Sequence, residues 1–250
     1  AQILAAAVHG ELGALVVAGV DHADLPDPQG ALAGIDAAEF VVSLEQRVTA
    51  ITERANVVFP VAAVAERSGM FVDWEGRPRP FGTVLPESGT LPDLRVLAGV
   101  AAEMGTPLGF RTVEDARADM AELGAWDGPR APRPRVSPGA AVRPGRGEAV
   151  LDTWRLLLDD GTMQAGEPYL AATARRVSAA VSAGTLSGLG ITAGDEVVLR
   201  TARGAVALPV LVADLPDGVV WAPANSGRLS LRLLLGAGSG DVVRLERGDA

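Results

Sequence analysis

The sequence predicts an α/β protein, with a parallel-sheet (Rossmann-like) domain followed by a small β-barrel. Short apolar runs at 14–18, 40–43 and 57–59 are spaced like the strands of βαβ units in an open parallel sheet. Beyond residue 150, short apolar segments alternate with turns rich in Gly, Asp and Pro, which is typical of a small closed barrel.

Helices are expected around the first three strands. The Ala-rich residues 1–10 favour a helix before the first strand, and a helical stretch is expected from near Leu44 to Arg54. Two more helices are predicted at 92–104 and 112–123. Thr112 can serve as the N-cap of the last one, because Asp115 follows three residues later as in a capping box.

The barrel region is expected to contain six strands and one short helix. The helix is predicted from Ala183 to Leu189, and Gly194 with Asp195 forms the turn into the following strand. The strands are predicted at 151–158, 174–178, 195–201, 205–212, 219–222 and 241–245.

The domain boundaries follow from composition. We predict an α/β domain at 1–126, which enters in mid-fold, a linker at 127–149 and the barrel domain at 150–250. The linker holds five Pro, four Gly and five Arg with only two acidic residues, a composition that favours an extended segment. It is either a solvated linker or a basic strap on an acidic partner surface.

Composition excludes several classes of function. The net charge of −9 argues against nucleic-acid binding, which depends on Lys and Arg contacts to phosphate, and all 22 basic residues are Arg. Without cysteine, these 250 residues contain no disulfide, thiolate zinc site or Cys-ligated cluster. No apolar run is long enough to predict a membrane span. Because no initiator Met is present, we interpret the sequence as the middle of a longer chain.

Open parallel sheets bind ligands at the carboxyl ends of their strands. Here those ends carry GVDHADLPDP, SLEQRVT and PVAAVAERSG, and none has the G-x-G-x-x-G order of a phosphate loop. In the first of them, His22 lies beside Asp21 and Asp24, which could form a metal site or a solvated loop. We favour the loop, because His9 is the only other histidine and lies 13 residues away.

Two further features have alternative interpretations. Asp73 and Glu75 could form an acid–base pair on a turn, or Gly76 could take a left-handed conformation while Arg77 pairs with a nearby acid. We expect the second. Three tryptophans surround the linker and the barrel, and either anchor packing between the domains or mark a partner interface: Trp126, Trp154 and Trp221.

Motifs in both halves resemble one family. The second half carries Leu189-Gly190-Ile191, Gly194-Asp195-Glu196-Val197, Gly204, Leu208-Pro209-Val210, Pro216-Asp217-Gly218-Val219, Pro223 and Asn225. The first half carries Thr49-Ala50, Ala55-Asn56-Val57-Val58-Phe59-Pro60, Glu66, Gly69, Phe71, Asp73 and Glu75-Gly76-Arg77. Over about 40–110 and 170–247, the chain resembles the molybdopterin oxidoreductase superfamily. Within that superfamily it is most similar to the large iron–sulfur subunit of bacterial respiratory complex I.

The resemblance implies a double-psi β-barrel and a structural role. The chain would be the cofactor-free C-terminal portion of that subunit, with no catalytic, cofactor-binding or metal residues of its own. Iron–sulfur clusters would lie in the N-terminal part. The partners would be other subunits of the peripheral arm, on the cytoplasmic side of the plasma membrane, without nucleic acid or direct membrane insertion. The parent complex would transfer electrons from NADH to quinone, coupled to proton translocation.

Two alternatives remain open. The chain could be the pterin-dinucleotide-binding portion of an active molybdopterin oxidoreductase of the formate dehydrogenase or nitrate reductase type. Asn225 could then hydrogen-bond a guanine edge, although we expect it to cap a turn after Pro223. The chain could also be a free-standing assembly module.

Overall fold

The computed structural model describes residues 2–86, 89–135 and 142–248, which form two compact units. One unit contains residues 1–20 and 31–135, and the other contains residues 21–30 and 136–250. Residues 136–141 of the predicted linker lie outside the described residues. The predicted domain boundaries at 126/127 and 149/150 remain a prediction.

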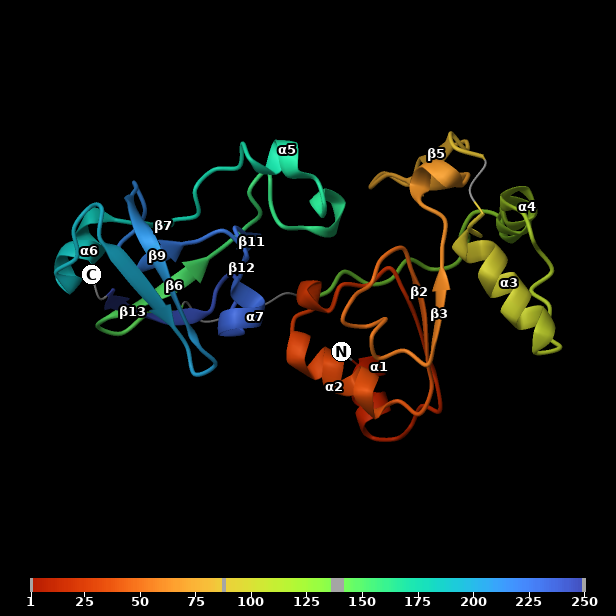
Figure 1. Ribbon diagram of the computed structural model, residues 1–250, viewed down its shortest axis with the longest axis horizontal. Coiled ribbons are helices and arrows are strands. Elements are labelled where there is room, and N and C mark those ends of the chain that lie inside the picture. The colour runs from red at the N-terminus through yellow and green to blue at the C-terminus, as the bar shows by residue number, and fades with distance from the viewer. Residues whose placement is uncertain (1, 87–88, 136–141, 249–250) are drawn as a thin grey trace. The chain divides into compact units, whose positions relative to one another are not determined.

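The first unit is built on a three-stranded parallel sheet in the order β1–β2–β3 (Figure 1). The strands are β1 (Leu15–Ala18), β2 (Val41–Glu45) and β3 (Val57–Pro60). Helices α1 (Gln2–Val8) and α2 (Pro28–Ala37) precede β1 and β2. Ala7, Leu15, Ile35 and Val41 form one buried cluster, so both helices and two strands share a core.

The expected helix from Leu44 to Arg54 is wrong. Strand β2 continues to Glu45, and residues 50–54 form turns before β3. Thr49 and Thr52 exchange hydrogen bonds between amide and hydroxyl, at 2.7 and 3.2 Å, as in a capping box, and the Glu53 amide donates to the Thr49 carbonyl at 3.1 Å, so one helical turn forms. The turn is not extended, because the Asn56 amide donates to the Val41 carbonyl at 2.9 Å and Asn56 Oδ1 accepts from the Val41 amide at 2.7 Å, which directs the chain into β3. Only the β1–β2 connection therefore contains an α-helix.

The rest of this unit consists of a hairpin and two helices. Strands β4 (Gly69–Val72) and β5 (Pro78–Phe81) pair antiparallel after the 3₁₀ turn η2 (Val64–Glu66). Helices α3 (Asp93–Glu103) and α4 (Val113–Leu123) confirm the two predicted helices. The capping box is also confirmed, since Thr112 Oγ1 accepts from the Asp115 amide and Asp115 Oδ2 from the Thr112 amide, both at 3.1 Å.

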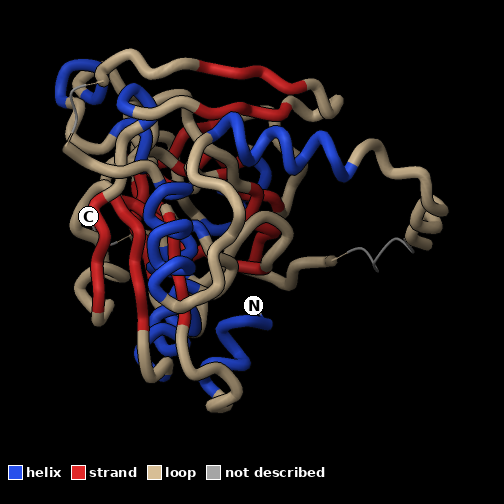
Figure 2. The backbone as a smooth tube through the Cα atoms, turned by 90° about the vertical axis from the view of Figure 1, so that its right-hand side faces the viewer, coloured by secondary structure: helices blue, strands red, loops and turns tan. Residues whose placement is uncertain are grey.

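The second unit contains a closed six-stranded barrel in the order β10–β6–β13–β8–β9–β7 (Figure 1). Its strands are among those drawn in red in Figure 2. The strands are β6 (Glu148–Asp152), β7 (Ala179–Val181), β8 (Glu196–Arg200), β9 (Ala205–Val212), β10 (Val219–Trp221) and β13 (Val242–Arg247). Pairs β10–β6 and β7–β9 are parallel, and the others are antiparallel. Alternate residues point inward, so that Leu151, Leu199 and Val220 meet in one apolar core.

Two of the predicted barrel strands differ from the observed ones. No strand forms at 174–178, where Arg175 and Arg176 are both exposed, and β7 begins only at Ala179. Strand β6 begins at Glu148, within the predicted linker, and ends at Asp152 rather than at residue 158. The remaining elements of the unit are η1 (His22–Asp24), η3 (Thr162–Gln164), α5 (Pro168–Ala171), α6 (Ala183–Leu189), β11 (Asn225–Ser226), β12 (Leu229–Ser230) and α7 (Leu231–Leu235).

The turn before β8 forms as predicted. Gly194 has a φ of +96°, and the Asp195 carboxylate accepts hydrogen bonds from the amide and hydroxyl of Thr192, both at 2.9 Å. These hydrogen bonds lower the pKa of Asp195. The turn therefore has a charged carboxylate as its structural centre.

Residues 21–30 pack on the barrel although they follow β1 in sequence. Arg203 Nη1 lies 3.2 Å from Asp27 Oδ1, and Arg232 Nη1 donates to the Asp24 carbonyl at 2.8 Å. Pro28 is fully buried. The pKa of Asp27 is lowered, mainly by the Gly30 amide and then by Arg203. Two arginines of the barrel unit thus hold this segment.

Candidate functional site

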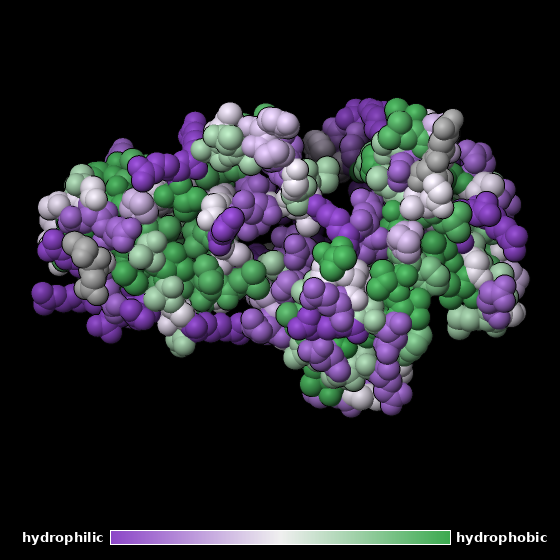
Figure 3. Space-filling view, in the orientation of Figure 1, coloured by the Kyte–Doolittle hydropathy of each residue, from purple (hydrophilic) through white to green (hydrophobic). Residues whose placement is uncertain are grey.

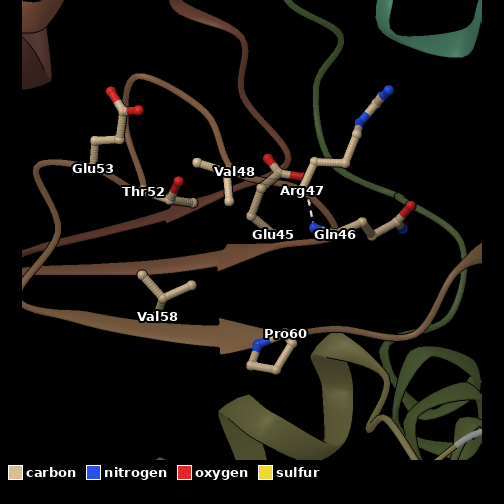
Figure 4. A pocket seen from close by; sticks show the side chains of 8 residues that line it. All are labelled: Glu45, Gln46, Arg47, Val48, Thr52, Glu53, Val58 and Pro60. Atoms are coloured by element: carbon tan, nitrogen blue, oxygen red, sulfur yellow. Dashed lines mark hydrogen bonds between the residues drawn. The ribbon is translucent and has the colours of Figure 1, made fainter. Parts of the chain in front are cut away.

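One cavity lies at the carboxyl ends of β2 and β3, where the fold class predicts ligand sites (Figure 4). Its volume is about 370 Å³. Figure 4 shows Val58 and Pro60 on β3, and above them the side chain of Glu45, from the end of β2, with those of the loop that follows. The lining residues are Glu45, Gln46, Arg47, Val48, Thr52, Glu53, Val58 and Pro60.

Most polar groups of this cavity already have protein partners. Glu45 Oε1 accepts from the Gln46 amide at 2.8 Å, and Gln46 Nε2 donates to the Ala62 carbonyl at 3.4 Å. The Thr52 hydroxyl donates to the Thr49 carbonyl at 2.9 Å. The lining contains no histidine, cysteine or serine, the residues that most often act as nucleophile or base.

The turn at 73–77 has the structural arrangement that we expected. Gly76 has a φ of +81°, and Arg77 Nε lies 2.9 Å from Asp73 Oδ2. Arg77 also pairs with Glu75, so one guanidinium binds both carboxylates. The Arg77 amide, and then its side chain, lower the pKa of Asp73, which disfavours a role for this carboxyl as a proton donor. The absence of a catalytic role for Asp73 and Glu75 remains a prediction.

His22 lies in the short η1 turn. Its Nδ1 is 3.5 Å from Asp21 Oδ1, which accepts a hydrogen bond from the Ala23 amide at 2.9 Å. Asp24 contributes its backbone carbonyl to Arg232. Among the described residues, no group of three or more His, Cys, Asp or Glu side chains is placed to hold a metal ion. The geometry is that of a turn whose polar groups bind one another.

Asn225 lines a second cavity, of about 640 Å³, within the barrel unit. Its backbone pairs with Ser230 across the β11–β12 hairpin, and its carbonyl accepts from the Asp160 amide at 3.0 Å. None of the described residues hydrogen-bonds its side chain. The backbone role agrees with a turn-forming residue, but the expected side-chain cap is not observed.

Two of the three singled-out tryptophans contact each other. The rings of Trp154 and Trp221 have centroids 5.1 Å apart, with an interplanar angle of 50°. Trp221 Nε1 is buried and, like Ser226 Oγ, finds no hydrogen-bond partner among the described residues. Trp126 is 79% exposed and belongs to the other unit. The roles of these residues as a domain anchor or a partner contact remain hypotheses.

Sequence reasoning missed a polar cluster at the start of α6. Ser182 Oγ donates to Asp217 Oδ1 at 2.6 Å, and Thr185 Oγ1 accepts from the Gly218 amide at 2.9 Å. A Cβ on Gly184 would lie 2.4 Å from the Asp217 carboxylate, so glycine permits the close approach. In the sequence, the PDG tripeptide at 216–218 stands out only as a family motif. Nothing local to it indicates the partner 35 residues earlier.

Comparison with known proteins agrees with this architecture. Residues 150–246 match the family described as "Molydopterin dinucleotide binding domain". The NADH-quinone oxidoreductase G subunit of Mycobacterium tuberculosis is 46% identical over 98% of this chain and 31% of its own length. The protein of the same name from Streptomyces coelicolor is 47% identical over 98% of this chain and 30% of its own. The chain thus spans about a third of the length of these relatives.

A solved structure shares the fold. Acetylene hydratase from Pelobacter acetylenicus superposes with a TM-score of 0.57 at 17% identity, over 88% of this chain and 38% of that protein. At this identity the likeness concerns the fold alone. The resemblance predicted from the sequence is therefore confirmed: the chain is similar along 98% of its length to the G subunit of NADH-quinone oxidoreductase, and its residues 150–246 match the molydopterin dinucleotide binding domain family.

Proposed function

We propose that this chain is the C-terminal portion of a G subunit of NADH-quinone oxidoreductase and has a structural role there. The observation that carries the proposal is the identity of 46–47% to two such subunits along 98% of the chain. The parent complex transfers electrons from NADH to quinone and couples this to proton translocation. This portion scaffolds the peripheral arm and has no catalytic residue of its own.

The proposal includes the absence of a bound pterin cofactor. A pterin dinucleotide carries two phosphates, so its site needs cationic side chains or free amides. In the cavity that contains Asn225, Arg232 already donates to a backbone carbonyl and Arg155 faces Asp159 at 4.0 Å. Thr153 Oγ1 and Ser239 Oγ donate to protein oxygens at 2.7 and 2.8 Å. Asp24 and Asp159 balance the charge of Arg155 and Arg232 in this lining, so the cavity offers a pyrophosphate no net positive charge, which supports a structural barrel.

The finer fold assignments belong to the same proposal. We infer a double-psi topology for the barrel, supported by its closed sheet with two parallel and four antiparallel strand pairs. We infer a Rossmann-like character for the first unit, supported by the parallel order β1–β2–β3.

The location and partners follow from the parent complex. The iron–sulfur clusters lie in the N-terminal part of the subunit, and the partners are the other subunits of the peripheral arm on the cytoplasmic side of the plasma membrane. In the part of the chain that the structure describes, no helix combines the length and the hydropathy of a membrane span.

An active molybdopterin oxidoreductase is the second candidate. It is favoured by the family match at residues 150–246 and by the Asn225 side chain, which has no partner among the described residues and lines a cavity. Such an enzyme would use Asn225 to hydrogen-bond the purine edge of a dinucleotide.

Elemental and pterin analysis of the native, full-length protein separates the two candidates. Molybdenum and tungsten are measured by mass spectrometry, and oxidised pterin by fluorescence. We expect neither metal nor pterin, with iron present and NADH–quinone activity in the isolated complex. Stoichiometric molybdenum or tungsten together with pterin would refute the structural role and support the second candidate.

A further inference from the structure

A groove in the first unit has an apolar floor. It lies between the β4–β5 hairpin, the start of α3 and helix α4, and has a volume of about 570 Å³. Phe71 and Phe81 stack in it with ring centroids 4.9 Å apart, and Met70 and Met120 extend the same surface. Figure 3 shows hydrophobic side chains at the surface around β5 and α3.

Helix α4 forms one wall of the groove and buries none of its side chains. Val113, Ala116, Met120 and Leu123 follow one another at spacings of three and four residues, so they share one face of the helix. Met120 is 54% exposed and Leu123 is 85% exposed. These exposures show that the apolar face of α4 lacks a cover within the described residues. An isolated helix of this length is marginal in water, because most of a helix's stability comes from packing of its apolar face, so a cover would stabilise α4.

The polar residues of the groove are mainly cationic. Arg67, Arg95, Arg111 and Arg117 line it, against Asp93 and Glu114. Arg67 pairs with Asp93, whereas none of the described carboxylates forms an ion pair with the other three arginines. The lining thus has a net charge of +2, although the whole chain has a net charge of −9. Charge complementarity selects an acidic occupant.

The shape favours a polypeptide over a small molecule. The apolar stripe of α4 runs from Val113 to Leu123, a rise of about 15 Å along the helix axis, and Leu123 lies beyond the residues that line the cavity. An amphipathic segment laid along a groove makes contacts with this spacing. A small ligand in the cavity would leave Leu123 exposed.

We propose that an acidic amphipathic segment of the same subunit, from outside these 250 residues, docks in this groove along α4. The inference rests on the proposed function, because the chain spans about a third of the length of the related subunits. Two thirds of such a subunit are covalently attached to this unit. Their high effective concentration favours an intramolecular occupant over a separate protein.

Site-specific photo-crosslinking in the full-length subunit tests this inference. A photoreactive amino acid replaces Met120, and the matched control carries it at Ala118, which is exposed on the opposite face of α4. Cross-linked peptides are identified by mass spectrometry in the assembled complex. We expect position 120 to cross-link to an Asp- and Glu-containing segment of the same subunit, with a yield several-fold above that of position 118.

Two other outcomes would overturn the inference. Cross-links from position 120 to a different subunit would show that the occupant is a separate protein. Equal yields at positions 118 and 120, or none at either, would show that the apolar face is uncovered. Replacing Arg111 and Arg117 by Glu should abolish the cross-link from position 120, and an unchanged yield would refute the acidic character of the segment.

The proposed function is tested separately in the same material. Recovery of the subunit with NADH-quinone oxidoreductase tests the assignment, whatever the cross-links show. If the subunit does not co-purify with that complex, the proposed function fails, and the cross-link of position 120 can still be measured in the isolated full-length subunit.

Discussion

Leu199 provides the sharpest test of the barrel core. It lies on β8, fully buried, with Val206 of β9 on one side and Leu245 of β13 on the other. Replacing a buried leucine by alanine costs about 2–5 kcal/mol, and the cost is highest where the surroundings cannot collapse into the cavity. Because the closed sheet restrains β8 on both sides, we expect about 3–5 kcal/mol for Leu199→Ala. That is a large share of the ~5–15 kcal/mol that stabilises a typical domain.

Leu211→Ala is the matched control, because Leu211 lies on the neighbouring β9 and is 53% exposed. We expect it to cost less than about 1 kcal/mol, since little apolar surface leaves the core. Urea unfolding of both variants is followed by pulsed hydrogen–deuterium exchange and mass spectrometry on β6 and β13, which reports on the barrel unit separately. If the two variants lost equal amounts of unfolding free energy, or if Leu199→Ala lost less than ~1 kcal/mol of it, the inward orientation of Leu199 would be refuted.

Three further predictions concern the barrel unit. Arg203→Ala should increase proteolysis within residues 21–30, because it removes the partner of Asp27, and unchanged digestion kinetics would contradict that role. The pKa of Asp27 is lowered from 3.8. In the wild-type chain, the protection of residues 21–30 from proteolysis that Asp27 provides is therefore complete well above pH 3.8 and is lost as the pH falls through the lowered pKa. Loss of this protection already near neutral pH would contradict the prediction. Gly227 and Arg228 both have left-handed φ angles, of 63° and 65°, in the two-residue β11–β12 loop. Arg228→Gly should therefore preserve or raise the thermal midpoint, whereas Arg228→Val should cost about 1–2 kcal/mol, and the reverse order would refute the strained turn.

The sequence by itself predicted the elements whose signal is local. Alternating or continuous apolar runs indicated β1, β2, β3, β8 and β9, and the pair Thr112 and Asp115 indicated where α4 begins. Such signals depend on side chains within one turn or one strand, so they can be interpreted without the fold. The motif resemblance also came from the sequence, and the comparisons confirmed it.

Local signals failed where a distant neighbour decided the conformation. The helix expected from Leu44 to Arg54 is limited to one turn, because Asn56 hydrogen-bonds the backbone of Val41, 15 residues earlier on β2. The start of β6 at Glu148 depends on pairing with β13 and β10, which lie about 70 or more residues later in the chain.

The candidate sites were mostly decided by the tertiary structure. The sequence placed Asp73, Gly76 and Arg77 in one turn because these residues are neighbours in the chain. It contained no sign that Arg203 and Arg232 bind residues 21–30, or that α4 and the β4–β5 hairpin form one groove. The physical reason is that contacts across such separations depend on chain folding and not on any local pattern. The chemical identity of each residue was therefore readable from the sequence, but its partner was set by the fold.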